Sequence, residues 1–332
     1  MPQHDITFYC TVNENNWSHH PVAPGKYACI APVYGRTKRS KTINYVAVPP
    51  STQIILDSGA FSDTTDTRLT FEQALFRQAA HAYRFGYVRQ VTHIASYDRL
   101  INEKCLVGRP STCWSDAEAD RAVTETIDAA AYISHLRNTI SGIFMHPVGV
   151  ILTAQGIDAE QYLRCAAAIA PMLSRHDVLE LGGFAATGLF PGSMLPPFRE
   201  IIRKVIPYLS SYDIKRIHIW GVCLATALAE LLALCKRYGI ALSTDSSGPQ
   251  RRPILGQWGY ASWYDPTYRL LPLLPSCKTR DTSGNRAPSC MPSSRCRGLE
   301  RERHVKLTRA WLARLSMREK ELYALADRAS GL

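Results

Sequence analysis

Short apolar runs alternate with longer amphipathic segments along most of the chain. Brief runs rich in Val, Ile and Leu are typical of parallel strands, which are buried on both faces. Seven such runs predict strands at residues 27–33, 54–57, 88–93, 148–153, 178–181, 216–222 and 240–244, and a weaker eighth lies at 257–261. Between them, apolar residues spaced three or four positions apart predict helices at 71–85, 116–137, 159–169, 198–209 and 226–238. Ser115 and Glu118 form a capping-box pattern where the second of these helices begins.

This alternation predicts an α/β fold, a (β/α)8 TIM barrel. A doubly wound open sheet is the alternative, but no Gly-rich dinucleotide-binding pattern follows the first predicted strand. We predict a TIM-barrel domain at residues 1–268, which includes a polar N-terminal segment, and a small C-terminal appendage at 269–332. The appendage begins rich in Ser, Pro, Arg and Cys and continues as an amphipathic basic helix at 299–328.

The net charge of +11 is unevenly distributed over the 332 residues. Residues 276–332 contain 13 Lys and Arg against 6 Asp and Glu, which accounts for +7 of the total. A basic excess of this size favours a polyanionic partner, and nucleic acid is the first candidate. Six basic residues in presumed loops are predicted to contact phosphates: Arg36, Lys38, Arg39, Lys41, Arg251 and Arg252.

The sequence does not predict a membrane protein. No apolar run approaches the ~18 residues that a membrane-spanning helix needs. The N-terminal residues lack the basic and then apolar pattern of a signal peptide. Ten cysteines without such a signal are typical of a reducing compartment, so we expect a cytoplasmic protein with mostly free thiols.

Two of the predicted strands end on a carboxylate that small residues and Gly follow. Residues 54–56 lead into Asp57-Ser58-Gly59, and residues 240–244 lead into Asp245. The carboxyl ends of parallel strands share one rim of a barrel, where catalytic groups are found. Two acids at this rim can serve as a nucleophile and as an acid/base. The structural alternative is that each Asp caps the turn or helix that follows it.

The ends of the predicted strands carry a series of short motifs. In chain order they are Asp57-Ser58-Gly59-Ala60-Phe61, Tyr97-Asp98, Ala154-Gln155-Gly156, Leu181-Gly182-Gly183-Phe184-Ala185, Trp220-Gly221-Val222 and Thr244-Asp245-Ser246. Over residues 54–249 this ordered series resembles the tRNA-guanine transglycosylase superfamily, TIM-barrel enzymes that exchange guanine for a 7-deazaguanine.

Three departures from the family pattern make the chain more similar to the DNA-directed branch of that superfamily, which places 7-deazaguanines in DNA. Ala60 stands where the first motif has a second Gly. Ser-Ser-Gly-Pro follows Asp245 in place of a longer Leu-Pro-Thr-Arg-like segment. The late cysteines lack the compact Cys-x-Cys-x-x-Cys spacing of the tRNA enzymes.

The resemblance implies a pentosyltransferase that replaces guanine in DNA by a free 7-deazaguanine base through a covalent aspartyl-nucleoside intermediate. In this role Asp245 is the nucleophile, and Asp57 gives a proton to the leaving base and takes one from the incoming base. Rival functions are a tRNA-directed transglycosylase, a catalytically silent nucleic-acid-binding subunit and a barrel glycosidase. Accessory modification proteins are possible partners.

Five further residues are predicted to bind the base. A carboxylate at Asp98 can accept hydrogen bonds from N1–H and the exocyclic amine of guanine, and an amide at Gln155 can donate to O6. Glycines let backbone N–H groups approach a base closely. Structural alternatives are an N-cap or a salt bridge to Arg99 for Asp98, a helix start for Gln155 and a tight turn for the glycine pair. The predicted base-binding residues are Ser58, Asp98, Gln155, Gly182 and Gly183.

A possible zinc site lies in the appendage. Cys277, Cys290, Cys296 and His304, separated by 12, 5 and 7 residues, offer three thiolates and an imidazole. This donor set suits structural Zn²⁺. The resemblance supports it, because family members carry a Cys₃His zinc near this place. A disordered, Arg- and Ser-rich tail with incidental thiols is the alternative.

Overall fold

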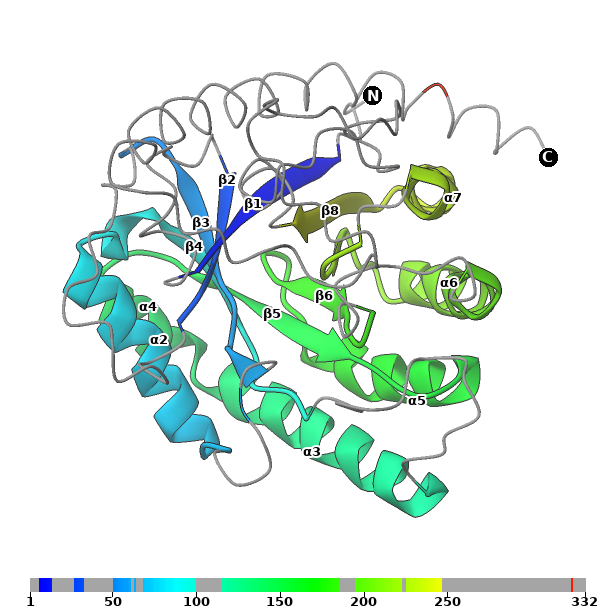
Figure 1. Cartoon of the computed structure of the whole chain (residues 1–332), viewed down its shortest axis with the longest axis horizontal. Helices are drawn as coiled ribbons and strands as arrows, with labels where there is room; N and C mark the ends of the chain where they lie inside the picture. The colour runs from blue at the N-terminus through cyan, green and yellow to red at the C-terminus, as the bar shows by residue number, and fades with distance from the viewer. Residues whose placement is uncertain are drawn as a thin grey trace, which may run out of the picture.

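The computed structural model describes residues 6–13, 27–32, 50–60, 63, 68–99, 115–184, 195–222, 225–246 and 324. Eight parallel strands within these residues follow one another in chain order and form a closed barrel (Figure 1). The strands are β1 (Thr7–Asn13), β2 (Tyr27–Ala31), β3 (Gln53–Leu56), β4 (Val91–Ala95), β5 (Gly149–Ala154), β6 (Val178–Leu181), β7 (Arg216–Ile219) and β8 (Ala241–Ser246). The predicted α/β barrel of eight strands is confirmed.

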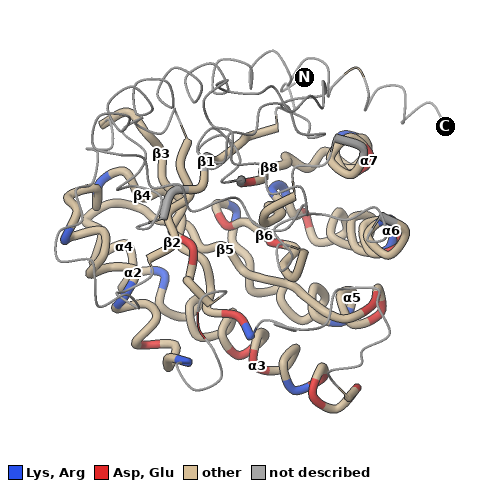
Figure 2. Tube along the Cα trace, in the orientation of Figure 1, with Lys and Arg blue, Asp and Glu red and all other residues tan. Residues whose placement is uncertain are grey.

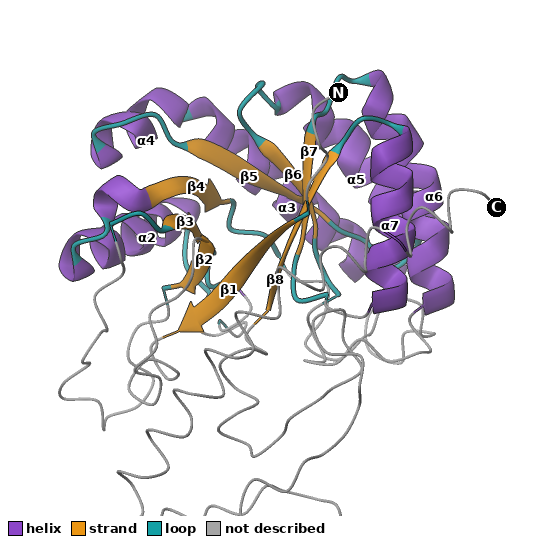
Figure 3. Cartoon of the chain, turned by 90° about the horizontal axis from the view of Figure 1, so that it is seen from above, coloured by secondary structure: helices purple, strands orange, loops and turns teal. Residues whose placement is uncertain are grey.

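Helices lie outside the ring of strands (Figure 3). They are α2 (Phe71–Phe85), α3 (Asp116–His135), α4 (Arg137–Phe144), α5 (Ala159–Ile169), α6 (Leu195–Ser211) and α7 (Ala225–Arg237), with short 3-10 helices η3 (Val88–Gln90) and η4 (Ala170–Met172). The capping box that starts α3 is present, because Ser115 Oγ accepts from Glu118 N and Glu118 Oε2 accepts from Ser115 N. One long helix was predicted over 116–137, and the chain instead forms two helices that meet at Leu136.

The N-terminal segment contains a strand that was not predicted. Residues 7–13 were assigned to a polar segment, yet they form β1, which pairs with β2 on one side and with β8 on the other. Thr7 lies opposite Ser243, and Tyr9 lies opposite Asp245. The weaker strand predicted at 257–261 falls outside the described residues, and the ring closes through β1.

Side chains of the strands alternate between two cores. Ile54 and Leu56 belong to the large core between strands and helices, whereas Ile55 packs inside the barrel with Tyr9 and Val178. Such alternation is expected of a filled barrel. Two residues further along, the inward positions become polar: Asp57 follows Ile55, and Glu180 follows Val178. The apolar interior therefore gives way to polar side chains toward the carboxyl ends of the strands.

Charges of both signs are scattered over the described helices (Figure 2). The described residues contain 16 Lys and Arg and 17 Asp and Glu, and the remaining residues contain 23 and 11. The positive excess of the chain therefore lies entirely outside the described barrel. In the described part of the chain, no helix is long and apolar enough to cross a membrane.

Residues 269–332 are outside the described residues apart from Ala324, which is helical. The boundary at 268 and the C-terminal appendage thus stay predictions.

Candidate active site

Four acids gather toward the carboxyl end of the barrel. Asp57 directly follows β3, Asp98 follows β4, Glu180 lies on β6 and Asp245 lies on β8. Between the two predicted catalytic acids stand only β1 and β2. The charges of Asp57 and Asp245 act on each other, as do those of Asp57 and Asp98 and those of Asp98 and Glu180. The structure thus brings acids from distant parts of the sequence into one electrostatic cluster.

Asp245 is buried and held by fixed donors. Its Oδ1 accepts a hydrogen bond from Gly221 N at 2.6 Å, and its Oδ2 accepts one from the Thr11 hydroxyl. Nε2 of His218 lies 3.7 Å from Oδ1. These three contacts come from β7, β1 and the turn after β7, so neighbouring strands orient the carboxylate.

Asp57 is only partly exposed, and its environment favours the protonated form. Its Oδ1 accepts from Gly59 N at 3.2 Å, and its own N–H donates to Ile30 O on β2 at 2.9 Å. Burial raises the pKa of Asp57 from 3.8 to about 6. The hydrogen bond from Gly59 N–H lowers this pKa, and the charge of Asp245 raises it further. The bond to Gly59 is the turn contact that the structural alternative predicts, so Asp57 both shapes its loop and can carry a proton near neutral pH.

Asp98 is a buried acid whose carboxyl group receives no hydrogen bond from another described residue. It is 8% exposed, and no hydrogen bond from another described residue reaches its carboxyl oxygens. Arg68 donates to the main-chain carbonyl of Asp98, at 3.1 Å. Burial, followed by the charge of Asp57, raises the pKa of Asp98 to about 7. Among the described residues, the Asp98 carboxyl group receives a hydrogen bond only from its own main chain, so it is suited to a ligand that supplies further donors.

Glu180 is a member of the acid cluster that sequence reasoning missed. It is 2% exposed inside the barrel, where it accepts from Thr153 Oγ1 at 2.7 Å and from the Trp220 side chain. Burial, and then the charge of Asp98, raises the pKa of Glu180 well above its ordinary value. The available signal was one charged residue within the otherwise apolar run 178–181.

The predicted base-binding residues differ in which of their hydrogen-bond donors are already engaged within the protein. Both amide hydrogens of Gln155 are used, on Arg99 O and on Thr126 Oγ1, the latter at 2.6 Å. Gln155 therefore ties the segment after Asp98 to α3, and its predicted donation to O6 would require these bonds to break. Gly182 N donates to Ala154 O at 3.0 Å. The Gly183 N–H makes no hydrogen bond to another described group, and Gly183 has a φ of +83°, which favours glycine.

A buried arginine holds the loop after β3. Arg77, from α2, donates to Ser58 O and forms an ion pair with Asp63 at 2.9 Å. Asp63 also accepts from the Tyr97 hydroxyl at 2.8 Å. Ser58 Oγ accepts from Ala60 N at 3.3 Å, so this predicted substrate contact is also part of the turn. The clamp connects the segment after Asp57 to the segment before Asp98.

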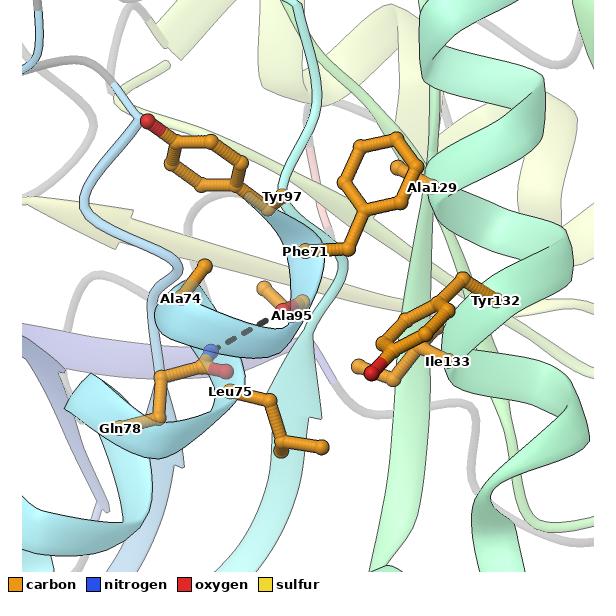
Figure 4. A pocket seen from close by; sticks show the side chains of 9 residues that line it. All are labelled: Phe71, Ala74, Leu75, Gln78, Ala95, Tyr97, Ala129, Tyr132 and Ile133. Atoms are coloured by element: carbon orange, nitrogen blue, oxygen red, sulfur yellow. Dashed lines mark hydrogen bonds between the residues drawn. The ribbon is translucent and has the colours of Figure 1, made fainter. Parts of the chain in front are cut away.

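A small pocket lies between α2 and α3, and its wall is mostly apolar (Figure 4). Gln78 lines this pocket, and its side-chain amide donates to Ala95 O at 3.0 Å, as the dashed line in Figure 4 shows. The same amide reaches Leu56 O and Asp57 O, both at 3.3 Å. Gln78 thus joins the ends of β3 and β4. The pocket belongs to the outer helical layer, with Tyr97 on its wall.

Ten predicted site residues lie outside the described residues. They are Arg36, Lys38, Arg39, Lys41, Arg251, Arg252, Cys277, Cys290, Cys296 and His304. Within the described ranges, no group of three or more His, Cys, Asp or Glu could hold a metal ion. Zinc binding and phosphate binding therefore stay predictions, and Cys₃His is a donor set that fits structural Zn²⁺.

Comparison with known proteins leaves the site to be interpreted from its own geometry. No protein-family model matches the chain, and no curated protein matches it.

Proposed function

We propose that the protein is a base-exchange glycosyltransferase that replaces guanine in DNA by a 7-deazaguanine. The main support for this proposal is the pair Asp57 and Asp245, which lie at one mouth of the barrel, at the ends of β3 and β8, in contrasting environments. Asp245 receives hydrogen bonds on both oxygens, whereas Asp57 has a pKa raised to about 6. Two carboxyl groups in contrasting environments are the arrangement expected of a nucleophile and an acid/base.

In the first half of the reaction, a carboxylate oxygen of Asp245 attacks C1′ of the target nucleotide. The C1′–N9 bond breaks, its electron pair goes to the departing guanine, and Asp57 gives that guanine its proton. The product is an ester between Asp245 and C1′, with the phosphodiester strand intact.

In the second half, the incoming base gives its N9 proton to Asp57 and attacks C1′ through N9. The ester bond breaks, and its electron pair returns to the Asp245 carboxylate. Both acids then have their starting protonation states, so Asp57 works once as acid and once as base.

Base recognition falls to Asp98 and the Gly182-Gly183 turn. Asp98 accepts from N1–H and the exocyclic amine of guanine or of a 7-deazaguanine, which compensates for its burial. The N–H of Gly183, which makes no hydrogen bond to another described group, donates to O6. Gln155 supports this pocket indirectly by holding Arg99 and Thr126.

DNA is the proposed nucleic acid because of the departures in sequence from the tRNA enzymes. The positive charge outside the described barrel supplies contacts to phosphates. Zinc at Cys277, Cys290, Cys296 and His304 would stabilise the appendage structurally and takes no part in the exchange.

The test is incorporation of labelled guanine by the full chain, with duplex DNA and tRNA as parallel acceptors. We expect label in DNA, loss of incorporation in Asp245→Asn, and unchanged incorporation in Asp128→Asn, an exposed acid on α3. Nucleic-acid affinity of Asp245→Asn should stay within a few-fold of the original. Label in tRNA alone would overturn the choice of DNA, and label in neither would overturn the proposed activity.

A further inference from the structure

His218 is a buried histidine, and one of its ring nitrogens makes no hydrogen bond to any described residue. It lies on β7, is 0% exposed, and packs edge-on against Trp220 at a centroid distance of 4.4 Å and against Tyr9 at 5.9 Å. Within the part of the chain that the structure describes, its Nε2 is buried without a hydrogen-bond partner, and it lies 3.7 Å from Asp245 Oδ1. A buried polar atom without a partner is costly, and this one faces the proposed nucleophile.

The other ring nitrogen is already engaged. Nδ1 of His218 lies 2.9 Å from Ser243 Oγ, and the Ser243 hydroxyl is 3.1 Å from Ile217 O. The single hydroxyl hydrogen can go to Nδ1 or to Ile217 O. In the first case neutral His218 carries its hydrogen on Nε2. In the second case Nδ1 carries one hydrogen, and Nε2 either carries another or directs a lone pair at Asp245. A hydrogen on Nε2 avoids lone-pair repulsion from the Asp245 carboxylate.

We infer that His218 directs an Nε2–H at the Asp245 carboxylate from 3.7 Å, that this donor closes to hydrogen-bond distance as the carboxylate regains its charge, and that it shortens the life of the covalent intermediate. This inference rests on the proposed function. The carboxylate loses its charge when the ester forms and regains it when the ester breaks. A donor that favours the charged form therefore promotes release of the nucleoside from Asp245 in the second half of the reaction. His218 is accordingly a positioning residue.

Among the titratable groups around His218, Asp245 is the charged partner of its ring. On β8 the facing acid is Asp245, and on β1 it is the Tyr9 phenol, whose pKa is raised above its ordinary value, chiefly by burial. On β4 the electrostatic neighbour is His93, whose pKa falls to about 4, again chiefly through burial. On β6, Glu180 accepts a hydrogen bond from the side chain of Trp220, which packs against His218. Tyr9 and His93 are thus neutral near pH 7, so neither competes as a charge partner for Asp245.

A matched pair of variants separates the two ring nitrogens. Gln in place of His218 can put an amide nitrogen near the position of Nε2, whereas Asn can put one near Nδ1. We expect His218→Asn to lower turnover about 10- to 100-fold, the scale of a lost hydrogen bond to a charged group. The protein–DNA adduct should accumulate in denaturing gels of that variant, and His218→Gln should recover most of the turnover. Recovery by Asn and not by Gln would overturn the inference, since the contact with Ser243 would then be the important one.

Nitrogen NMR of ¹⁵N-His protein tests the contact without any activity. The side-chain signals of His218 are assigned through the backbone of β7. We expect a protonated Nε2 at pH 7 that shifts in Asp245→Asn, while Nδ1 changes less. An Nε2 signal that ignores Asp245→Asn would overturn the inference. A shift as expected in a protein that performs no base exchange would leave the contact intact and contradict the proposed function alone.

Discussion

Asp57 illustrates how one side chain can serve both local structure and chemistry. Its bond from Gly59 N–H shapes the turn, and burial together with the charge of Asp245 raises its pKa to about 6. In the proposed reaction, loss of guanine needs the protonated acid, and entry of the new base needs the carboxylate. A pKa near the working pH is the best compromise for a group with both tasks.

We therefore predict a pH dependence for the first half of the reaction. In single-turnover measurements with excess protein, release of guanine should slow as the pH rises above about 6, because Asp57 loses the proton that it must donate. Asp57→Asn should reduce the rate by ~10²-fold or more and abolish this limb of the profile. A variant that is less stable but equally active per folded molecule would support the capping role alone.

Raised carboxyl pKa values also make stability depend on pH. The pKa of Asp98 is about 7 in the folded protein and ordinarily 3.8, so between these values the folded state binds more protons than the unfolded state. The contribution of Asp98 to stability is complete below about pH 4 and is lost as the pH rises through about 7.

Asp98→Asn should remove this dependence. We expect the melting temperature of the variant to exceed that of the original at pH 8 and to approach it at pH 4, measured by circular dichroism. Asp128→Asn, at an exposed position, is the control. A difference between Asp98→Asn and the original that is the same at both pH values would contradict the assignment of a raised pKa to this acid.

At the scale of elements, the end of β3 depends on α2. Arg77 and Gln78 of that helix reach the carbonyls of Ser58, Leu56 and Asp57. These bonds satisfy backbone groups just where the strand ladder stops. The helix therefore holds the loop that carries a proposed catalytic acid.

Gly59 and Gly86 form a matched test of this clamp. Both have positive φ, +78° and +75°. A Cβ at Gly59 would lie 2.7 Å from Arg77 Nη2, whereas no atom of a described residue lies within 4 Å of one at Gly86. Gly86→Ala should cost about 1–2 kcal/mol for the left-handed backbone. We expect Gly59→Ala to cost clearly more in urea unfolding, because the guanidinium must move. Equal costs would mean that Arg77 adapts freely.

At the scale of the whole molecule, the positive excess lies outside the described barrel. The described residues are close to neutral, and the others carry the positive excess. Contacts to a polyanion are therefore expected from the segments outside the described barrel, while the acids at its mouth are the proposed catalytic groups.

Arg251 and Arg252, close after Asp245 in sequence, provide a test of phosphate binding. Replacing both by Ala should weaken binding to a similar extent for duplexes of different sequence. The slope of log affinity against log salt should fall by up to roughly two, about one for each lost phosphate contact. Affinity is measured against salt for several duplexes. An unchanged slope, or a loss confined to one sequence, would show another role.

Zinc is predicted to stabilise the appendage. Elemental analysis of purified protein should find about one zinc per chain, as expected for a closed four-ligand site. Cys290→Ser should lower the zinc content and the melting temperature, and Cys235→Ser, a buried thiol on α7, should leave the zinc content unchanged. Metal-free protein with an unchanged melting temperature would refute the prediction.

Local pattern determined much of this molecule. Periodic apolar positions were sufficient to predict α2 and α5 with the bounds that the structure shows, and the capping box located the start of α3. Strand-end motifs located Asp57, Asp98 and Asp245 at one rim, because parallel strands end at the same rim and a carboxylate after an apolar run is a local signal.

Closure of the barrel and the environment of its acids were decided by tertiary structure. Residues 7–13 show their role as β1 only in pairing with β2 and β8, since Thr7, Thr11 and Asn13 interrupt the apolar run that is typical of a buried parallel strand. The electrostatic effect of Asp98 on Glu180, the hydrogen bond of Gln155 to Arg99, and the approach of His218 to Asp245 join residues far apart in sequence. Such contacts depend on which side chains face the barrel interior at one height, and that is set by strand register around the ring.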